Sequence, residues 1–441
     1  MLMRLVLAIA ILATTSISAH EVASSSPTSD LEQCRKLGLQ RCPVPFDVVL
    51  PPAHDMLTWS QEERVVGFRN TYRQYAGDVF HADPAHVYAL TSGAANLSPR
   101  YNVGRREFGL EDYVKHQSVT GLLVLQDGHI AYEHYAHGNT ETTLWTSRSV
   151  AKSVVSVLVG IAIHEGRIKS VDDQITAYLP ELRKTAWDGV SLRNLLQHTS
   201  GVAWNENYAD PKSDFAKLTH CEASADAYNC VLQLVRGVAR KPGVKPGDVW
   251  SYNTGGAWLV GRVLERATGM PIAKYLETRL WQRFGMEHDG VWEALRAGEV
   301  DMGGHGFNAT LRDWGRFGLF VARGGVLPNG EALLPTGWLI DSTRWTKAKG
   351  SVDAADPDGQ YGYQWWHQSV SAGSDPRVKD IADRSLWAEG IYGQVIGIDP
   401  IRKLVMVQWS TYKDADGSDA LAEEQLLFFA ALQAALTGDA P

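Results

Sequence analysis

Short apolar segments of the kind that forms β-strands occur near both ends of the chain. The segments VTGLLVLQ (119–126) and HIAYEHYA (129–136) flank Asp127-Gly128, and this arrangement predicts a β-hairpin. After about residue 355, strand-like segments rich in aromatic and β-branched residues return, separated by Gly, Pro or Asp. They are YGYQWWHQS, LWAEGIYGQVIGIDP and KLVMVQWS.

Between these parts the spacing of apolar residues is mostly helical. A long apolar stretch follows Ser149 and continues to Ile163. SLRNLLQHTSG begins with Ser191, a favourable N-cap, and ends at Gly201, a favourable helix end. Further helices are expected in SVDDQITAYLP, TGGAWLVGRVLERATG, NATLRDWGRFGLFVARGG and, near the C-terminus, ALAEEQLLFFAALQAALTG.

These patterns predict an α/β (α+β) fold with a mainly antiparallel sheet flanked by helices. Both ends of the chain contribute to the sheet, and a helical domain is inserted between them. The expected boundaries are 20–165 and 355–437 for the discontinuous sheet-containing domain, and 166–354 for the mainly helical domain. The interface of the two domains is the expected place for an active site.

The first 19 residues have the pattern of a secretory signal. Arg4 supplies a positive charge, Leu5–Ala13 is a short apolar run, and Ala19 is a small residue suited to cleavage. The run is short for a bilayer span, so we expect cleavage, with an uncleaved anchor as the alternative. No other stretch is long and apolar enough to span a membrane, and the mature chain is therefore expected to be periplasmic or secreted.

Composition narrows the classes of partner. The chain has 441 residues, a net charge of -8 and no basic cluster, so a nucleic-acid partner is not expected. The four cysteines form two local pairs, Cys34 with Cys42 and Cys221 with Cys230. Export favours two disulfides over a zinc site, since the Cys-x-x-Cys spacing is missing. We expect neither a metal nor a cofactor, and the sequence gives no oligomeric state.

One residue of the long apolar helix is out of place in a hydrophobic core. Lys152 lies one turn from the helix start, and burial of an ammonium is costly unless its charge is paired or lost. Ser149 lies three residues earlier, on the same helix face. A lysine whose pKa is depressed by burial can take the proton of a neighbouring serine. The alternative is a lysine whose ammonium reaches out to solvent. A second Ser-x-x-Lys, Ser410 to Lys413, follows a strand and is not expected to act.

The surroundings of Ser149 and Lys152 resemble the serine β-lactamase-like superfamily of SxxK hydrolases. The matching segments are SRSVAKSVVSVLVGIAIHEGRIKSVDDQITAYLPEL, LLQHTSG, WSYNTGGAWLVGRVLERATG, GFNATLRDWGRFG, YGYQWW and AEGIYGQVIGIDP, between about Val119 and Val407. The sequence is most similar to the branch of class C β-lactamases, SxxK esterases and aminohexanoate-oligomer hydrolases. This resemblance implies a β-lactamase/transpeptidase-like fold, with Ser149 as nucleophile and Lys152 as general base.

The resemblance also implies roles in two further motifs. Tyr252 matches the tyrosine of the second motif, which relays a proton to the leaving group, and Thr254 stands where the family often has Asn. The third motif is AEGI, in which Ala388 replaces the lysine that helps anchor a β-lactam carboxylate. The backbone N–H groups of Ile391 and Ser149 match the oxyanion hole, and Gly390 is expected near the substrate.

Other residues have weaker indications. Trp204, Glu206 and Tyr208 follow LLQHTSG and are candidate substrate contacts, with loop packing as the alternative. Asn308 either faces the pocket or caps the following helix. His198 and Ser200 suggest a Ser–His pair, but the resemblance implies a structural role for this stretch. His305 has no interpretation from the sequence, and the G-x-S-x-G nucleophile motif of α/β-hydrolases is missing.

Three functional hypotheses follow. The leading one is an exported serine hydrolase that forms an acyl-enzyme on Ser149 and cleaves an ester or a small linear amide. The first alternative is a β-lactamase or D-Ala-D-Ala peptidase. The second, from another class, is a catalytically silent homologue that binds ligands. The presence of Ser149, Lys152 and Tyr252 together favours an enzyme.

Overall fold

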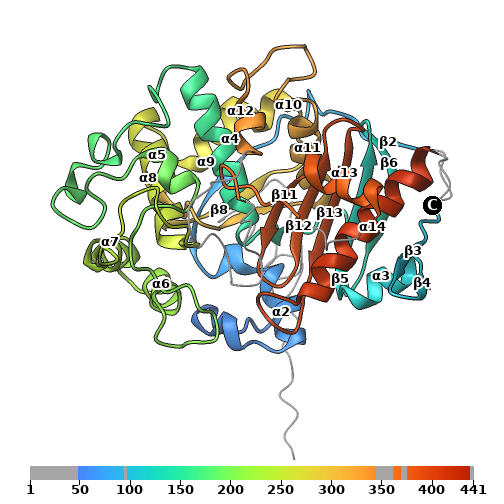
Figure 1. Cartoon of the computed structure of the whole chain (residues 1–441), viewed down its shortest axis with the longest axis horizontal. Helices are drawn as coiled ribbons and strands as arrows, with labels where there is room; N and C mark the ends of the chain where they lie inside the picture. The colour runs from blue at the N-terminus through green and yellow to red at the C-terminus, as the bar shows by residue number, and fades with distance from the viewer. Residues whose placement is uncertain (1–47, 94–96, 344–360, 369–374, 438–441) are drawn as a thin grey trace, which may run out of the picture.

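The computed structural model describes residues 48–93, 97–343, 361–368 and 375–437 of the chain (Figure 1). The N-terminal signal, Cys34 and Cys42 lie outside the described residues. Cys221 and Cys230 form the predicted disulfide, which joins two neighbouring helices. Among the described helices, none has both the length and the apolar character needed to cross a bilayer.

The largest sheet joins both ends of the described chain, as predicted (Figure 1). Its strand order is β11-β12-β13-β5-β6-β2, and all pairs are antiparallel except β2 with β6. The predicted hairpin is β5–β6, and its turn residues Asp127 and Gly128 both have positive φ, +48° and +87°. The strands are β2 Thr91–Ser92, β5 Val119–Gln126, β6 His129–Tyr135, β11 Leu386–Gly390, β12 Gln394–Asp399 and β13 Leu404–Ser410.

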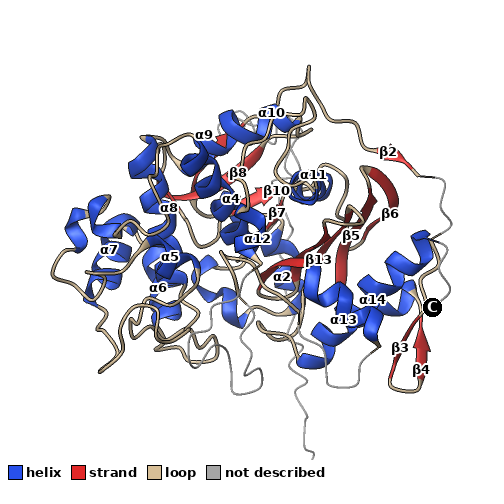
Figure 2. Ribbon diagram, turned by 45° about the horizontal axis from the view of Figure 1, so that its top comes forward, coloured by secondary structure: helices blue, strands red, loops and turns tan. Residues whose placement is uncertain are grey.

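Helices cover both faces of this sheet (Figure 2). In β5, Leu122 and Val124 belong to a core with α14, while Leu123 and Leu125 face the core that contains α4 and α11. Because consecutive side chains of a strand point to opposite faces, this double coverage explains why VTGLLVLQ is continuously apolar. The helices are α3 Leu110–His116, α4 Val150–His164, α11 Leu311–Ala322, α13 Pro376–Arg384 and α14 Asp419–Thr437.

A second sheet lies within and beside the segment that we predicted to be mainly helical. Its strand order is β1-β8-β10-β7, with β9 paired to β8. The sequence did not predict this sheet because β8 has the sequence GVWEALR, in which apolar and polar residues do not clearly alternate. Its strand character depends on antiparallel pairing with the distant strand β1. The strands are β1 Ala76–Phe80, β7 Trp145–Thr146, β8 Gly290–Arg296, β9 Val300–Asp301 and β10 Phe307–Ala309; β3 Tyr101–Val103 and β4 Arg106–Phe108 form a separate hairpin.

Most of the remaining helices lie on the side of the molecule away from the large sheet, whereas α2 lies beside the end of that sheet, where Gln61 donates to Thr411 at 3.2 Å (Figure 1). α5 begins after the predicted N-cap Ser191 but ends at Leu196, before Gly201, and SVDDQITAYLP contains only a 3₁₀ turn. The helices are α2 Gln61–Phe68, α5 Leu192–Leu196, α6 Asp214–Glu222, α7 Ala227–Gly237, α8 Thr254–Thr268, α9 Ile272–Leu276, α10 Gln282–Phe284 and α12 Trp338–Ser342. 3₁₀ turns occur at Ala53–Thr58, Thr71–Arg73, Ile175–Ala177 and Pro180–Leu182, and a π-helical turn at Glu277–Trp281.

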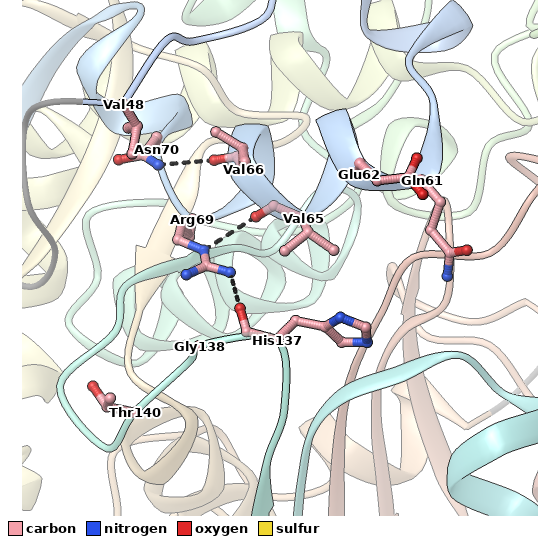
Figure 3. A pocket seen from close by; sticks show the side chains of 10 residues that line it. All are labelled: Val48, Gln61, Glu62, Val65, Val66, Arg69, Asn70, His137, Gly138 and Thr140. Carbon is pink, nitrogen blue, oxygen red and sulfur yellow. Dashed lines mark hydrogen bonds between the residues drawn. The ribbon is translucent and has the colours of Figure 1, made fainter. Parts of the chain in front are cut away.

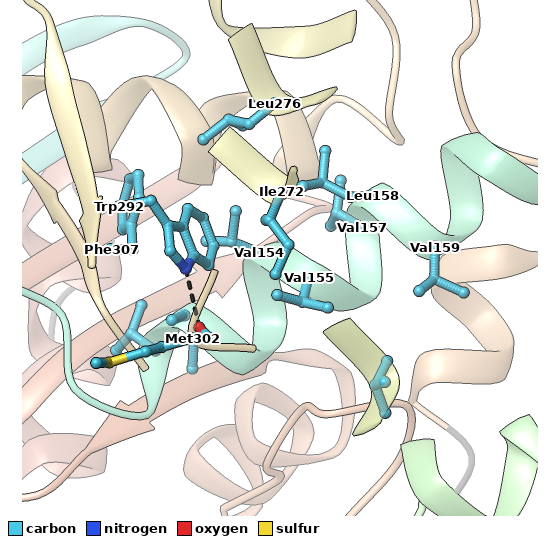
Figure 4. Close-up of a cluster of buried hydrophobic side chains, with 14 of the residues drawn as sticks. Val154, Val155, Val157, Leu158, Val159, Ile272, Leu276, Trp292, Met302 and Phe307 are labelled. Carbon is cyan, nitrogen blue, oxygen red and sulfur yellow. Dashed lines mark hydrogen bonds between the residues drawn. The ribbon is translucent and has the colours of Figure 1, made fainter. Parts of the chain in front are cut away.

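Helix α4 passes through the centre of the main core, and each of its residues from Val150 to Ala162 is buried. Figure 4 shows its valines beside Ile272 of α9 and Trp292 of β8. The Trp292 indole N–H donates to the Met302 carbonyl at 2.9 Å, so its polar atom is satisfied. A helix that is apolar all round is expected to be buried on all sides. The start of this helix, where Ser149 lies, is therefore firmly held.

Candidate active site

Ser149 directly precedes α4, at the edge of the main core. Its N-terminal neighbour Arg148 is buried and has φ of +47°, a backbone conformation that non-glycine residues seldom adopt. The same segment is fixed by the Ser147 N–H, which donates to the Phe307 carbonyl at 2.8 Å. Packing thus holds the chain in an unfavourable conformation at Arg148, directly before Ser149, as is common at functional sites.

Lys152 is buried, with 2% of its surface exposed, and it does not reach solvent. Its Nζ donates to Ser149 Oγ at 2.9 Å, to the Gly304 carbonyl at 2.8 Å and to Thr254 Oγ1 at 3.2 Å. Burial lowers the pKa of Lys152 to about 8, although Glu206 and Glu222 act in the opposite direction. A substantial fraction of Lys152 is therefore neutral near pH 8 and able to accept a proton.

Tyr252 completes the immediate surroundings of the Ser149 hydroxyl. Its side chain hydrogen-bonds with Ser149, and its ring lies 5.1 Å from Lys152 Nζ. Burial raises the pKa of Tyr252 above its usual value, with Glu206 and Glu389 acting in the same direction. The phenol is thus protonated at neutral pH, and its position beside Ser149 suits a group that passes a proton.

Thr254 and Glu206 form a polar chain behind the lysine. The Thr254 hydroxyl receives a hydrogen bond from Lys152 and donates one to Glu206 Oε1. Glu206 Oε2 also accepts from the Thr254 backbone N–H at 3.0 Å and from the Trp204 indole. Burial raises the pKa of Glu206, while Lys152 and these donors lower it. The hydroxyl of Thr254 therefore connects Lys152 to the carboxyl group of Glu206. The asparagine that the family often has at this position would make this connection with a different geometry.

The end of β11 lies directly against the nucleophile. A Cβ on Gly390 would lie 2.6 Å from the Ser147 carbonyl and 3.0 Å from the Ser149 backbone nitrogen. Only glycine fits this approach without displacement. The next residue, Ile391, borders the same pocket as Ser149. Ser149 and Ile391 thus belong to two segments that meet beside the pocket, and their backbone N–H groups are candidate donors to an oxyanion.

A pocket of about 670 Å³ opens in front of Ser149. It is lined by Ser149, Trp204, Glu206, Asn207, Tyr208, Trp250, Ser251, Tyr252, Trp366, Glu389, Gly390, Ile391, Ala415 and Asp416. Among these described lining residues none is a lysine or arginine, and three are carboxylates. Glu389 accepts from the Gln368 side chain, and burial raises its pKa to about 7. The pocket is therefore aromatic and acidic.

The structure separates the predicted site residues into two groups. The first group lines the pocket and consists of Ser149, Tyr252, Ile391, Gly390, Trp204, Glu206 and Tyr208. Lys152 and Thr254 lie directly beneath these residues. Asn308 does not line it and does not cap α11: it is fully buried in β10 and donates to Glu293 Oε1 at 3.1 Å, while Thr310 caps the helix. The suggestion that Asn308 faces the pocket is therefore not supported by the geometry.

The alternative catalytic pairs are not assembled. His198 packs against the Tyr252 ring at 4.4 Å between centroids, and burial lowers its pKa well below the usual value. Its Nε2 has no hydrogen-bond partner among the described residues, so it does not pair with Ser200. Ser410 is buried and donates to the Gln117 carbonyl, while Lys413 is exposed. The second Ser-x-x-Lys is therefore a chance match.

Several lining residues were missed from the sequence. Trp250, Trp366 and Asp416 come from separate loops, and no spacing connects them to Ser149. Glu389 lies within the AEGI motif, and its place beside Gly390 was the one signal that could have identified it. A further pocket of about 510 Å³ lies against α2 and His137 and contains neither Ser149 nor Lys152 (Figure 3).

The chain belongs to the Beta-lactamase family, whose model matches residues 110–431. It is similar to a 6-aminohexanoate-dimer hydrolase of Paenarthrobacter ureafaciens, with 29% identity over 70% of this chain and 76% of the relative. Esterase EstB of Burkholderia gladioli is 30% identical over 35% of this chain and 40% of its own. Among solved structures, a "Putative 6-aminohexanoate-dimer hydrolase from Bacillus anthracis" has a TM-score of 0.68 at 21% identity, covering 84% of this chain and 94% of the other. These matches confirm the predicted fold and superfamily.

Proposed function

We propose that this protein is a serine hydrolase that cleaves esters or small linear amides through an acyl-enzyme on Ser149. The observation that carries the proposal is the 2.9 Å hydrogen bond between Lys152 Nζ and Ser149 Oγ, at a buried lysine whose pKa is lowered to about 8. A neutral lysine in this place accepts the serine proton as the hydroxyl attacks a carbonyl carbon.

The proposed reaction uses each of these groups. In acylation, a bond forms between Ser149 Oγ and the substrate carbonyl carbon, and the Oγ proton passes to Lys152. The carbonyl oxygen becomes an oxyanion, for which the N–H groups of Ser149 and Ile391 are the donors. Collapse breaks the bond to the leaving alcohol or amine, which takes through Tyr252 the proton that Lys152 accepted. Water then attacks the acyl carbonyl carbon and gives a proton to Lys152. The bond between Ser149 Oγ and that carbon breaks, the carboxylic acid leaves, and Ser149 Oγ takes the proton back from Lys152.

The charge of the pocket supports a substrate without a carboxylate near the scissile bond. Ala388 is fully buried. By the family resemblance, it stands where β-lactam-binding members carry a lysine. Its neighbour Glu389 lines the pocket. None of the described lining residues is a lysine or arginine that would bind a carboxylate, and the lining tolerates neutral or cationic groups. This favours an ester or linear amide over a β-lactam, and the names of the hydrolase and esterase relatives agree with that preference.

The proposal is tested by labelling with a fluorophosphonate probe followed by peptide mass spectrometry. The label is expected on Ser149, and Ser149→Ala should lose it together with roughly 10⁴-fold or more of the activity. Ser410→Ala, which changes the serine of the second Ser-x-x-Lys, is the matched control and should label normally. No label on Ser149 in the folded wild-type protein would contradict the proposal.

A substrate panel separates the alternatives. p-Nitrophenyl esters and aminohexanoate oligomers should be turned over, and nitrocefin should be turned over slowly or not at all. Fast nitrocefin hydrolysis would instead favour a β-lactamase or D-Ala-D-Ala peptidase. No turnover across the panel, with calorimetric ligand binding that Ser149→Ala leaves unchanged, would favour a ligand-binding homologue.

A further inference from the structure

A buried cluster of charged side chains lies behind the proposed active site. His305 stands between two carboxylates: its Nε2 is 2.9 Å from Glu222 Oε1, and its Nδ1 is 3.6 Å from Glu293 Oε2. All three residues are buried, with 7%, 7% and 0% of their surface exposed for His305, Glu222 and Glu293. Burial of three ionisable groups is costly in free energy unless the groups form ion pairs or hydrogen bonds with one another.

The cluster is connected to Lys152 through the backbone. Lys152 Nζ donates to the carbonyl of Gly304, the residue immediately before His305. This loop has no room to move on the side of α8: a Cβ on Gly304 would lie 2.8 Å from Thr254 Cγ2, and one on Gly303 would lie 2.9 Å from the Gly261 Cα. The place of the Gly304 carbonyl therefore depends on what holds His305 on the other side.

The two carboxylates that hold His305 come from elements that are tied together. Glu222 ends α6, directly after Cys221, and the Cys221–Cys230 disulfide joins α6 to α7. Helix α7 packs against β8, the strand that carries Glu293. The predicted disulfide thus links the helix that carries Glu222 to the helix that packs against the strand of Glu293, so it helps to hold both carboxylates beside His305.

The charges of the cluster also act on the base. Burial alone would lower the pKa of His305, but Glu222 and Glu293 outweigh it and raise the pKa to about 9, so His305 is a cation at neutral pH. Glu222 also raises the pKa of Lys152, as Glu206 does. Glu222 and His305 line the same small cavity as Ser149 and Thr254. Glu222 Oε2 is buried and has no hydrogen-bond partner among the described residues.

We propose that Glu222 and His305 are positioning residues for Lys152. Together they fix the Gly304 carbonyl that receives the Lys152 ammonium, and they set the net charge that this ammonium faces. The inference rests on the proposed function, because it assigns the pair to the base of that reaction. Glu206, Tyr252 and the neutral His198 also face Lys152. Arg148 and Tyr75 line the small cavity beside Glu222 and His305 and interact with Glu293. None of these five residues is altered in the variants below.

The two members of the pair have opposite expected effects. Glu222→Gln removes a negative charge that stabilises the Lys152 ammonium, so Lys152 deprotonates at lower pH. His305→Gln removes the cation that offsets Glu222, so Lys152 deprotonates at higher pH. One charge acting through a protein interior is expected to move the acidic limb of the pH profile by roughly half to one pH unit.

The experiment measures the rate of Ser149 labelling by a fluorophosphonate against pH, which needs no knowledge of the substrate. Compared with wild type, the acidic limb should move down in Glu222→Gln, move up in His305→Gln, and stay in place in Glu222→Asp, which keeps the charge. Glu424→Gln is the matched control: Glu424 is also a buried carboxylate paired with a histidine, His116 at 2.8 Å, but it lies away from Ser149. Its limb should not move.

Each outcome separates this inference from the proposed function. Label on Ser149 in every variant, with the same acidic limb in all of them, would overturn the inference and leave the proposed function standing. Absence of label from Ser149 in the wild type would overturn both. If Glu222→Gln does not fold, His305→Gln decides: an upward shift supports the inference, and an unchanged or downward limb overturns it.

Discussion

The lysine at position 152 is tolerated in the core because every proton it carries has an acceptor. Ser149, Thr254 and Gly304 receive its three hydrogen bonds, and Glu206 and Glu222 supply negative charge nearby. Desolvation nevertheless outweighs these partners and lowers its pKa to about 8. The residue is therefore held near the balance between its charged and neutral forms, which suits a general base.

Lys152→Arg tests whether this balance matters. An arginine keeps the charge but does not deprotonate, so kcat/KM should fall by about 10²–10⁴-fold, nearly as far as in Lys152→Ala. In the wild type, kcat/KM should rise with pH through about 8, since the neutral lysine is the active form and its pKa is lowered to that value. Lys413→Arg, an exposed change, is the control. If Lys152→Arg retained much of the wild-type kcat/KM, Lys152 would act through its positive charge and not as the general base.

Gly390→Ala tests the contact between β11 and the nucleophile. The added Cβ would press on the Ser147 carbonyl at 2.6 Å and on the Ser149 nitrogen at 3.0 Å. Displacement of the N–H groups proposed for the oxyanion should lower kcat by about 10²–10³-fold, with a smaller change in KM. Gly237→Ala serves as the control because nothing lies within 4 Å of the place that its new methyl group would take. An unchanged kcat in Gly390→Ala would exclude this part of the proposed site.

At the scale of elements, α11 shows how a single buried carboxylate can organise a helix start. Asp313 accepts from Thr310 Oγ1 at 2.8 Å, from the backbone of Glu287 at 2.8 Å and from Arg316 Nη1 at 2.9 Å. Burial would raise its pKa, but Arg316 and His288, with these donors, lower it to about 2. The helix packs directly on the large sheet, and Asp313 anchors it to the loop that leads into β8 of the second sheet.

Asp313→Asn should therefore destabilise the protein by roughly 3 kcal/mol at pH 7, because Arg316 loses its buried partner. Since the pKa of Asp313 is lower in the folded than in the unfolded chain, its ionisation stabilises the fold above about pH 4. That stabilisation is lost as pH falls toward 2. Urea unfolding should thus show a smaller difference between wild type and variant at pH 3 than at pH 7. Asp383→Asn, at an exposed pair on α13, should change neither value.

On the scale of the whole molecule, the proposed site exists only where separate parts of the chain meet. Ser149 and Lys152 begin α4, Tyr252 and Thr254 precede or begin α8, and Gly390 ends β11. The same arrangement brings α7, which the disulfide links to α6, against β8 of the second sheet. That disulfide agrees with an oxidising compartment, which we propose for this protein on the basis of its N-terminal sequence.

Export has a direct test at this scale. When the full chain is produced in a bacterium with an intact secretion system, the mature protein should begin after Ala19, and its mass should be lower by the mass of the cleaved segment. The measurement is intact mass together with N-terminal sequencing of the periplasmic or secreted fraction. Replacement of Leu5–Ala13 by polar residues should keep the full-length chain in the cytoplasm. A full-length chain recovered from the membrane would instead indicate an uncleaved anchor.

The sequence by itself determined the features whose residues are neighbours along the chain. The β5–β6 hairpin follows from its Asp-Gly turn, and α4 follows from its continuous apolar run. The Ser149–Lys152 contact follows because residues three apart share one face of a helix. Tyr252 and Ile391 were placed by resemblance to known motifs, and the pocket contains both.

Tertiary structure alone decided the features that join distant segments. β8 is a strand because it pairs with β1, and neither its local pattern nor its propensity shows this. Glu389 was missed as a lining residue, and His305 had no interpretation until Glu222 and Glu293 were found on either side of it. The physical reason is that burial and charge pairing depend on which segments pack together. Packing brings together residues that lie far apart along the chain, and the local spacing of apolar and polar residues gives no indication of these contacts.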